Sequence, residues 1–212
     1  MISENIKRSE VLHFSQPHLQ TEVLALTRER RAELVENALL FLYRVPTRQA
    51  REELLALILT SIGDDETIAE LLTDVAYTVC NRHLTITSVN GAFLKRAGVE
   101  AEQILGKSLY YEREYEGTEI EQLYSMVMET RMTADTLVRY VGLGYDGWFV
   151  IVVIPLEGGG IGVLSRFSKD KNDFLPSELD LDSPEAPRLI TKEVSPVSED
   201  PEQEDEQEDQ ED

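Results

Sequence analysis

Cysteine is almost absent from this chain of 212 residues, since Cys80 is the only one. A single thiol excludes an internal disulfide and a Cys-based zinc site, and it gives no sign of a secreted scaffold. Long apolar runs are missing too, because the longest, residues 148–154, is far below the roughly 18 residues of a membrane helix. Residues 1–10 are polar and lack the apolar core of a signal peptide. These absences predict a soluble protein of the cytoplasm.

Lys and Arg are absent from residues 196–212, which contain ten Asp or Glu and about half of the formal charge of −21. Nonspecific affinity for nucleic acid or anionic lipid depends on phosphate neutralisation by Lys and Arg, so the charge balance argues against both partners. Helix and strand patterns fade after residue 168, and the acidic end cannot bury enough apolar surface to offset its ordering entropy. We therefore predict that residues 169–212 form a disordered acidic tail.

The N-terminal part of the chain has helical spacing. After a flexible lead-in over residues 1–17, the apolar pattern predicts a helix over residues 18–43. Thr47 is the predicted N-cap of a second helix that stops at Gly63, and Asp64 is the predicted N-cap of a third. Residues 18–73 are thus a helical region built on a helical hairpin. Its apolar stripes are too wide for a short hairpin to bury alone, so we expect them to pack on the following domain, on a second copy or on a partner.

A second domain is predicted over residues 74–168. Its β-rich runs cover residues 77–80, 84–89, 136–141, 148–155 and 161–167. Between the second and third run, helical spacing occurs over residues 90–96, 101–105 and 119–131. Asp146-Gly147 and the three glycines at residues 158–160 supply hairpin turns, because Gly accepts a positive φ. The order predicts an α+β fold with a five-stranded antiparallel sheet and short helices on one face.

Several short motifs in this second domain stand in an order that is known from one family. They are Asn81, Ile86 and Asn90 around the first hairpin, Phe93-Leu94 in the first small helix, Glu102-Gln103-Ile104-Leu105-Gly106-Lys107-Ser108, Asp146-Gly147-Trp148-Phe149, and Pro155 with Gly160 and Gly162. Together they resemble the PAS domain family of sensory and interaction modules. The resemblance covers residues 74–167 and implies the PAS fold and a role in signal transduction.

The chain departs from this family where relay to an output domain is expected. Members that signal forward often end the last strand with Asp-Ile-Thr and a helix leading to a kinase or cyclase, whereas this chain has Arg166-Phe167-Ser168-Lys169-Asp170. No output domain follows. The resemblance therefore implies a non-enzymatic signalling or adaptor protein that acts by protein–protein contact. We predict a homodimer that pairs through the N-terminal helices and couples to a separate regulatory protein.

Two other functions remain alternatives. The first is a sensor that binds a small molecule in its apolar interior. The second is a DNA-binding transcriptional regulator that uses the Arg-rich N-terminal helices, although the acids interleaved with these bases favour a salt-bridged surface. The bases concerned are Arg28, Arg30, Arg31, Arg44, Arg48 and Arg51.

The sequence does not show whether the protein binds a cofactor, because neither a haem-type His nor a flavin-type Cys is recognised. Haem-binding PAS domains usually offer a His from the helix that faces the cavity, but residues 119–131 contain none. His83 is predicted in a hairpin turn, and His13 and His18 at the surface or as caps. Photochemical flavin domains need a reactive Cys in a helix, whereas Cys80 ends a strand and is predicted to be buried. No carboxylate stands at a metal-type or catalytic spacing, so we predict no metal site and no enzyme.

The predicted interior is a mainly apolar set that packs as core or lines a ligand pocket. Its candidate pocket residues are Tyr77, Val79, Ile86, Phe93, Ile104, Leu123, Met126, Val138, Tyr140, Trp148 and Val150. Three other residues are assigned structural roles. Asn90 is expected to cap the helix at the strand-to-helix joint, Gly106 to end a helical turn, and Gly147 to form part of a hairpin turn.

Overall fold

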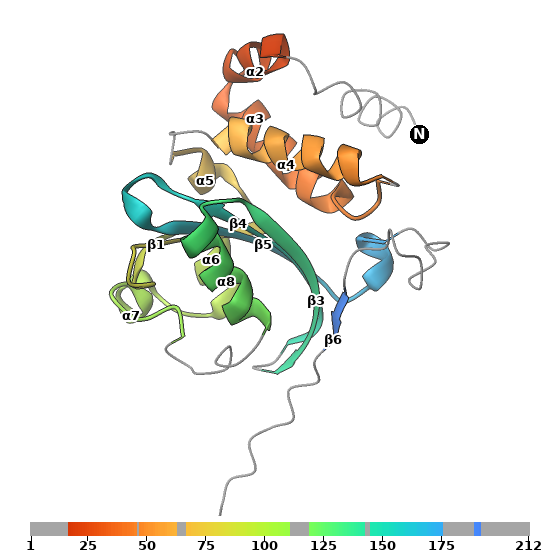
Figure 1. Cartoon of the computed structure of the whole chain (residues 1–212). Helices are drawn as coiled ribbons and strands as arrows, with labels where there is room; N and C mark the ends of the chain where they lie inside the picture. The colour runs from red at the N-terminus through yellow and green to blue at the C-terminus, as the bar shows by residue number, and fades with distance from the viewer. Residues whose placement is uncertain are drawn as a thin grey trace, which may run out of the picture.

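The computed structural model describes residues 17–45, 47–62, 67–110, 119–142, 145–175 and 189–191. A single sheet lies between two helical layers (Figure 1). The N-terminal helices cover one face, which we call the outer face, and the sheet curves around shorter helices on its inner face. Within the described ranges, none of the helices combines the length and the apolarity that crossing a membrane requires.

Five antiparallel strands form the bulk of the sheet, as predicted. Their order is β2-β1-β5-β4-β3, and their bounds are β1 Val75–Cys80, β2 Ile86–Val89, β3 Ala134–Gly142, β4 Tyr145–Pro155 and β5 Ile161–Ser168. Strand β5 lies in the middle of this order, where it pairs with β1 on one side and with β4 on the other. Strands β3 and β4 begin earlier than predicted, because polar residues such as Asp135 and Asp146 continue the ladder between them.

The inner helices are α6 Gly91–Ala97, α7 Ala101–Ile104 and α8 Glu119–Thr130. Helix α6 begins at Asn90, whose Oδ1 accepts a hydrogen bond from Phe93 N at 3.0 Å, and it ends at Gly98 with φ of 66°. In the turn before α7, Gln103 Oε1 accepts from Glu100 N at 2.8 Å. Side-chain caps of this kind satisfy N–H groups that the first helical turn leaves without partners.

The N-terminal layer consists of α2 Pro17–Leu24, α3 Arg28–Phe41, α4 Arg48–Ile62 and α5 Thr67–Leu71. The prediction of one helix over residues 18–43 is wrong, because the helix is interrupted between α2 and α3. Thr27 starts the new helix in an extended conformation, and its Oγ1 accepts from Arg30 N at 3.3 Å. The predicted cap at Thr47 is confirmed by a bond of 3.2 Å from Ala50 N. Gly63 and Asp64 lie outside the described residues.

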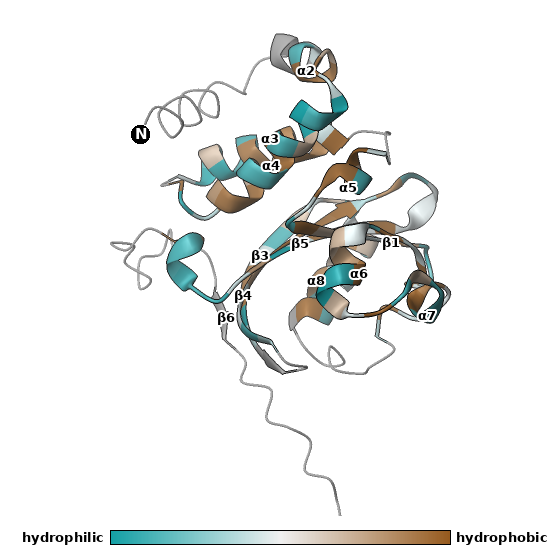
Figure 2. Ribbon diagram, turned by 180° about the vertical axis from the view of Figure 1, so that it is seen from behind, coloured by the Kyte–Doolittle hydropathy of each residue, from teal (hydrophilic) through white to brown (hydrophobic). Residues whose placement is uncertain are grey.

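The apolar stripes of the N-terminal helices pack on the chain's own sheet. Leu39, Leu54 and Ile58 are fully buried in one cluster with Val150 and Val152 from the outer face. Figure 2 shows this hydrophobic material in α3, α4 and α5 beside the sheet. Of the three predicted ways to bury these stripes, the structure uses the following domain. Each fully buried Leu or Ile contributes about 1.5–3 kcal/mol of transfer free energy, which makes this layer a large part of the core.

Regular structure and buried residues continue past residue 169, where the sequence predicts that the disordered acidic tail begins. The 3-10 helix η2, Lys171–Asp173, is capped by Asp170, whose Oδ1 accepts from Asn172 N at 2.8 Å. Phe174 and Leu175 follow and are buried in the outer-face cluster. Strand β6, Leu189–Thr191, adds to the sheet edge in parallel with β3. Residues 192–212 of the predicted tail lie outside the described residues.

Asp135, a half-buried acid, connects the helical layer to the sheet and makes stability depend on pH. Tyr43 Oη donates to Asp135 Oδ2 at 2.6 Å, and burial raises the pKa of Asp135, an effect that the bond from Tyr43 partly offsets. The unfolded chain therefore binds fewer protons at this site between the ordinary and the raised pKa. Stability is fully present below the ordinary pKa and is lost as pH rises through the raised pKa.

We expect Asp135→Asn to remove this part of the pH dependence and to be more stable than the wild type at pH 7. The amide oxygen can still accept from Tyr43, and the buried charge is gone. Chemical denaturation between pH 4 and pH 8 measures the effect. Glu102→Gln, which neutralises an exposed carboxylate in α7, is the control. An unchanged slope of stability against pH in Asp135→Asn would contradict the prediction.

Candidate functional site

A cavity of about 440 Å³ lies between the inner face of the sheet and the short helices. Its size is within the range that small-molecule sites occupy. The sheet contributes residues from β1 to β5, and the other walls come from α6, α8 and the loops beside them. The lining residues are Thr78, Ile86, Phe93, Arg96, Ala97, Val99, Leu109, Ile120, Tyr124, Val138, Tyr140, Tyr145, Phe149, Ile151, Val163 and Ser165.

Strand alternation decides which side chains reach the cavity. In β4, Phe149 and Ile151 line it, while Val150 belongs to the outer-face cluster. In β5, Val163 and Ser165 line it in the same way. Because successive side chains of a strand point to opposite faces, only every second residue of a strand can line the cavity.

The structure brings four of the predicted pocket residues together at the cavity: Ile86, Phe93, Val138 and Tyr140. Four others lie in or against the outer-face cluster, on the side of the sheet that faces the N-terminal helices: Tyr77, Val79, Trp148 and Val150. Ile104 and Leu123 do not line the cavity but are buried in the inner cluster, which we define as the buried residues on the inner face of the sheet, among them Val127 and Val153. Met126 of α8 is 45% exposed. The latter seven residues therefore do not shape the cavity wall.

Sequence reasoning missed the polar end of the cavity, which is formed by Arg96, Tyr145 and Ser165. Arg96 follows Lys95 in an exposed stretch of helix, so its sequence context is that of a surface residue. Tyr145 precedes the predicted β-rich run of residues 148–155, whereas in the structure it is the first residue of β4. Phe149 and Ser165 alternate with outer-face residues of their strands, and alternation alone does not show which of the two faces lies on the cavity.

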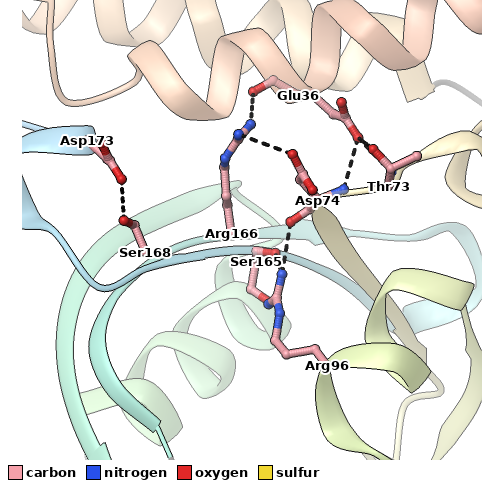
Figure 3. Close-up of polar contacts among 8 residues, drawn as sticks. All are labelled: Glu36, Thr73, Asp74, Arg96, Ser165, Arg166, Ser168 and Asp173. Carbon is pink, nitrogen blue, oxygen red and sulfur yellow. Dashed lines mark hydrogen bonds and ion pairs between the residues drawn. The ribbon is translucent and has the colours of Figure 1, made fainter.

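Arg96 reaches the sheet from α6 and holds three neutral acceptors (Figure 3). Its Nη1 donates to Ser165 Oγ at 2.9 Å, and its Nη2 donates to the main-chain oxygens of Ser165 and Asp74, each at 3.0 Å. The guanidinium carbon lies 5.7 Å from the centre of the Phe149 ring. Tyr145 Oη donates to the main-chain oxygen of Arg96. Burial lowers the pKa of Arg96, since desolvation disfavours its charged form.

A polar network continues from Arg96 to the N-terminal layer (Figure 3). Asp74, whose carbonyl accepts from Arg96, also pairs with Arg166 through its carboxylate at 3.5 Å. Arg166 Nη1 in turn donates to the main-chain oxygen of Glu36 in α3 at 3.0 Å. The Glu36 carboxylate accepts from the backbone N–H groups of Thr73 and Asp74 at 2.6 and 3.1 Å. The cavity wall and α3 are therefore joined by consecutive contacts around Asp74.

Aromatic rings line the wall beside Arg96. Tyr140 and Phe149 meet edge to face with ring centres 5.9 Å apart, and Tyr145 lies 5.6 Å from Phe149. Phe167, just outside the lining, lies with its ring centre 4.9 Å from that of Phe149 and its plane tilted by 47°. Edge-to-face pairs of this geometry are stabilising, so the contacts among these rings stabilise this side of the cavity.

Asn90 and Gly106 lie at joints of the fold as predicted, whereas the prediction of a hairpin turn at Gly147 is wrong, because Gly147 pairs with Tyr140 inside β4. Asn90 is 1% exposed and caps α6. Gly106 adopts φ of 81°, a left-handed conformation that favours Gly, and its N–H donates to Ile86 O at 2.9 Å. At Gly147 a Cβ would lie only 2.5 Å from Ser168 O, so the close approach of β4 and β5 requires Gly.

Cys80 and His83 are placed away from the cavity lining. Cys80 is 1% exposed in the inner cluster, and burial raises the pKa of its thiol to about 12, which disfavours the reactive thiolate. His83 is exposed in the first hairpin, where its Nε2 accepts from Arg82 at 3.1 Å. His13 and the side chain of His18 lie outside the description. Among the described residues, no group of three His, Cys, Asp or Glu is placed to hold a metal ion.

Comparison with known proteins gives one family match. The model of the PAS fold matches residues 72–169. Similar solved structures include a domain of an HTR-like protein from Haloarcula marismortui, at 16% identity and a TM-score of 0.38, with 44% of this chain and 97% of that chain covered. Another is the PAS domain of nitrogen regulation protein NR(II) from Vibrio parahaemolyticus, at 16% identity and a TM-score of 0.35, with 50% and 99% covered. No curated protein matches the sequence.

The matched segment contains all five antiparallel strands, the three inner helices and the whole lining of the cavity. Helices α2 to α5 precede it. Residues 72–169 therefore form a domain of the PAS family, a sensory and interaction module of signalling proteins.

Proposed function

We propose that this chain is a non-enzymatic cytoplasmic signalling protein that binds a small molecule in its PAS cavity and passes on the occupied state by protein–protein contact. The observation that carries the proposal is the cavity of about 440 Å³, with an apolar wall and a few convergent polar groups. The lining, within the described part of the chain, contains no Asp, Glu, His or Cys. It thus offers a binding surface and lacks the side chains that most often act as general acids and bases.

The contacts around Asp74 supply a route from the cavity to the surface. A ligand that moves Arg96 changes the acceptors of its guanidinium, one of which is the Asp74 carbonyl. Asp74 N–H is held by Glu36 of α3, so the position of this helix is tied to the same residue. We therefore place the output of the domain at the N-terminal layer, in agreement with the role that the sequence predicts for these helices.

Filling the cavity tests the proposal. The probe is 1-anilinonaphthalene-8-sulfonate, whose fluorescence rises in an apolar site. We expect the wild-type protein to bind one equivalent and Val138→Trp, which places an indole at the lining, to lose binding while keeping its circular dichroism spectrum. Leu71→Trp, at an exposed position of α5, is the control and should bind like the wild type. The proposal fails if the wild type binds no probe and carries no small molecule in native mass spectrometry, or if Val138→Trp binds as well as the wild type.

Pairing of two copies is proposed at the start of α3, not at its apolar stripe. The stripe is buried against the sheet, whereas Leu24 and Leu26 at the α2–α3 joint are 56% and 39% exposed. Light scattering of the double variant Leu24→Ser, Leu26→Ser tests this surface, and we expect the mass of a dimer to fall to that of a monomer. Leu105→Ser, at an exposed leucine next to α7, is the control. A wild-type protein that is already monomeric would rule out this mode of pairing.

The Arg-rich helices use their bases within the protein. Arg30 pairs with Glu33 at 2.7 Å, and Arg48 pairs with Glu52 at 2.8 Å. Arg31 is 7% exposed, and its Nη2 donates to two carbonyl oxygens at the end of α4. These contacts favour the salt-bridged surface over the DNA-binding alternative, so we do not propose DNA as a ligand.

A further inference from the structure

In the described part of the chain no carboxylate accepts a hydrogen bond from Arg96, and Asp74 acts on its charge only through space. A guanidinium has five N–H donors, and the three hydrogen bonds of Arg96 all go to neutral oxygens, those of Ser165 and Asp74. Its Nε–H and the second N–H of Nη1 have no acceptor among the described residues. The Asp74 carboxylate pairs with Arg166 instead. A cation that lines a mainly apolar cavity and still has N–H groups without an acceptor among the described residues is suited to bind an anion.

The number of cations limits the charge of that anion. Arg96 is the only Lys or Arg among the residues that line the cavity within the described chain. A phosphate or a dicarboxylate brings about two negative charges, and burying the second without a partner costs several kcal/mol. One guanidinium matches the single charge of one carboxylate, which can accept from the N–H groups of Arg96 that have no acceptor among the described residues.

The walls indicate the shape of the rest of the ligand. Five aromatic side chains line the cavity: Phe93, Tyr124, Tyr140, Tyr145 and Phe149. Phe149 lies against the Arg96 guanidinium, and Tyr140 meets Phe149 at an interplanar angle of 89°. A planar ring can add to such a group through further stacked or edge-to-face contacts.

We infer that the cavity takes a small aromatic monocarboxylic acid, with its carboxylate on Arg96 and its ring among the aromatic side chains of the inner face. This inference rests on the proposed function and names the class of ligand that the cavity senses. Arg96 is then the residue that selects acids over neutral molecules of the same shape. The aromatic rings select planar molecules and contact the acid and its neutral analogue alike.

The test compares an acid with its uncharged analogue. Titration calorimetry at pH 7 uses 3-phenylpropanoate and 3-phenylpropanamide, which share the ring and chain and differ in charge. We expect the wild type to bind the acid at least tenfold more tightly than the amide. Arg96→Gln should remove this preference. Lys95→Gln, which removes the neighbouring positive charge at an exposed position of α6, is the matched control and should keep the preference.

The outcomes separate this inference from the proposed function. Equal affinities for acid and amide in the wild type overturn the inference, and so does a preference that survives in Arg96→Gln. Absence of binding by both compounds also overturns it, even where the naphthalene sulfonate probe still binds and the cavity is a binding site of another class. The wild-type comparison of acid with amide decides the matter even if Arg96→Gln fails to fold.

Discussion

Replacing Asn90 by Ala is expected to destabilise the folded chain by at least about 3 kcal/mol, because several buried polar groups lose their partners at once. The Asn90 Oδ1 accepts from Tyr77 N and Phe93 N at 2.9 and 3.0 Å. Its Nδ2 donates to the carbonyl oxygens of Ala69 and Val75, both at 2.9 Å. One side chain thus connects α5, β1 and α6, and Ala satisfies none of these groups.

Urea denaturation followed by circular dichroism measures the loss at Asn90. The control is Asn172→Ala, which makes the same change at an exposed position of η2 and should alter the free energy of unfolding by no more than about 0.5 kcal/mol. A loss at Asn90 as small as that of the control would show that water or a shift of the backbone replaces the four bonds.

Phe174→Ala is expected to cost about 3–5 kcal/mol, the usual range for a fully buried Phe. Phe174 has 0% exposure and lies in the core that the N-terminal helices share with the sheet. It is held there by η2, where Phe174 N donates to Lys171 O at 3.0 Å. Arg44 near the end of α3 donates to Asn172 O at 2.8 Å and fixes the same turn from the other side.

The loss of stability in Phe174→Ala can be measured by the midpoints of thermal and urea denaturation. Phe174→Leu, which keeps most of the volume, should lose clearly less than Phe174→Ala. If Phe174→Ala were as stable as the wild type, residues 171–175 would not belong to the core and the tail would begin at residue 169, as the sequence pattern alone suggests.

The sequence predicts the five antiparallel strands in their order along the chain, but it does not assign side chains to a face where both faces of the sheet are covered. In β4, residues 149–154 are all buried or half-buried, so Phe149 and Val150 look equally apolar. Alternation separates them into two faces, but it does not say which face is the inner one. Trp148 and Val150 were therefore assigned to the pocket, although they lie against the N-terminal helices. Only the position of these helices resolves the choice.

Local signals predicted the joints better than the site. Asn90 precedes a helix at the end of a strand, and the physical demand for a cap identifies it without any tertiary information. Arg96 carries no such signal, because its role depends on Ser165 and Phe149, both more than fifty residues away. Phe174 and Leu175 are two apolar residues in a polar segment, and a composition average conceals them. Contacts between distant segments account for what the pattern misses.

The covered outer face has a consequence for the order of synthesis. Roughly a hundred residues separate the end of α4 from the middle of β5, which corresponds to about 5–20 s of translation at 5–20 residues per second. During this time α3 and α4 are already synthesised, while the sheet on which they pack is still incomplete. When β5 arrives, it enters the centre of the sheet beneath a helical pair that is already present. The N-terminal layer is therefore synthesised before the outer face that it covers, and it can pack on that face as soon as the central strand is in place.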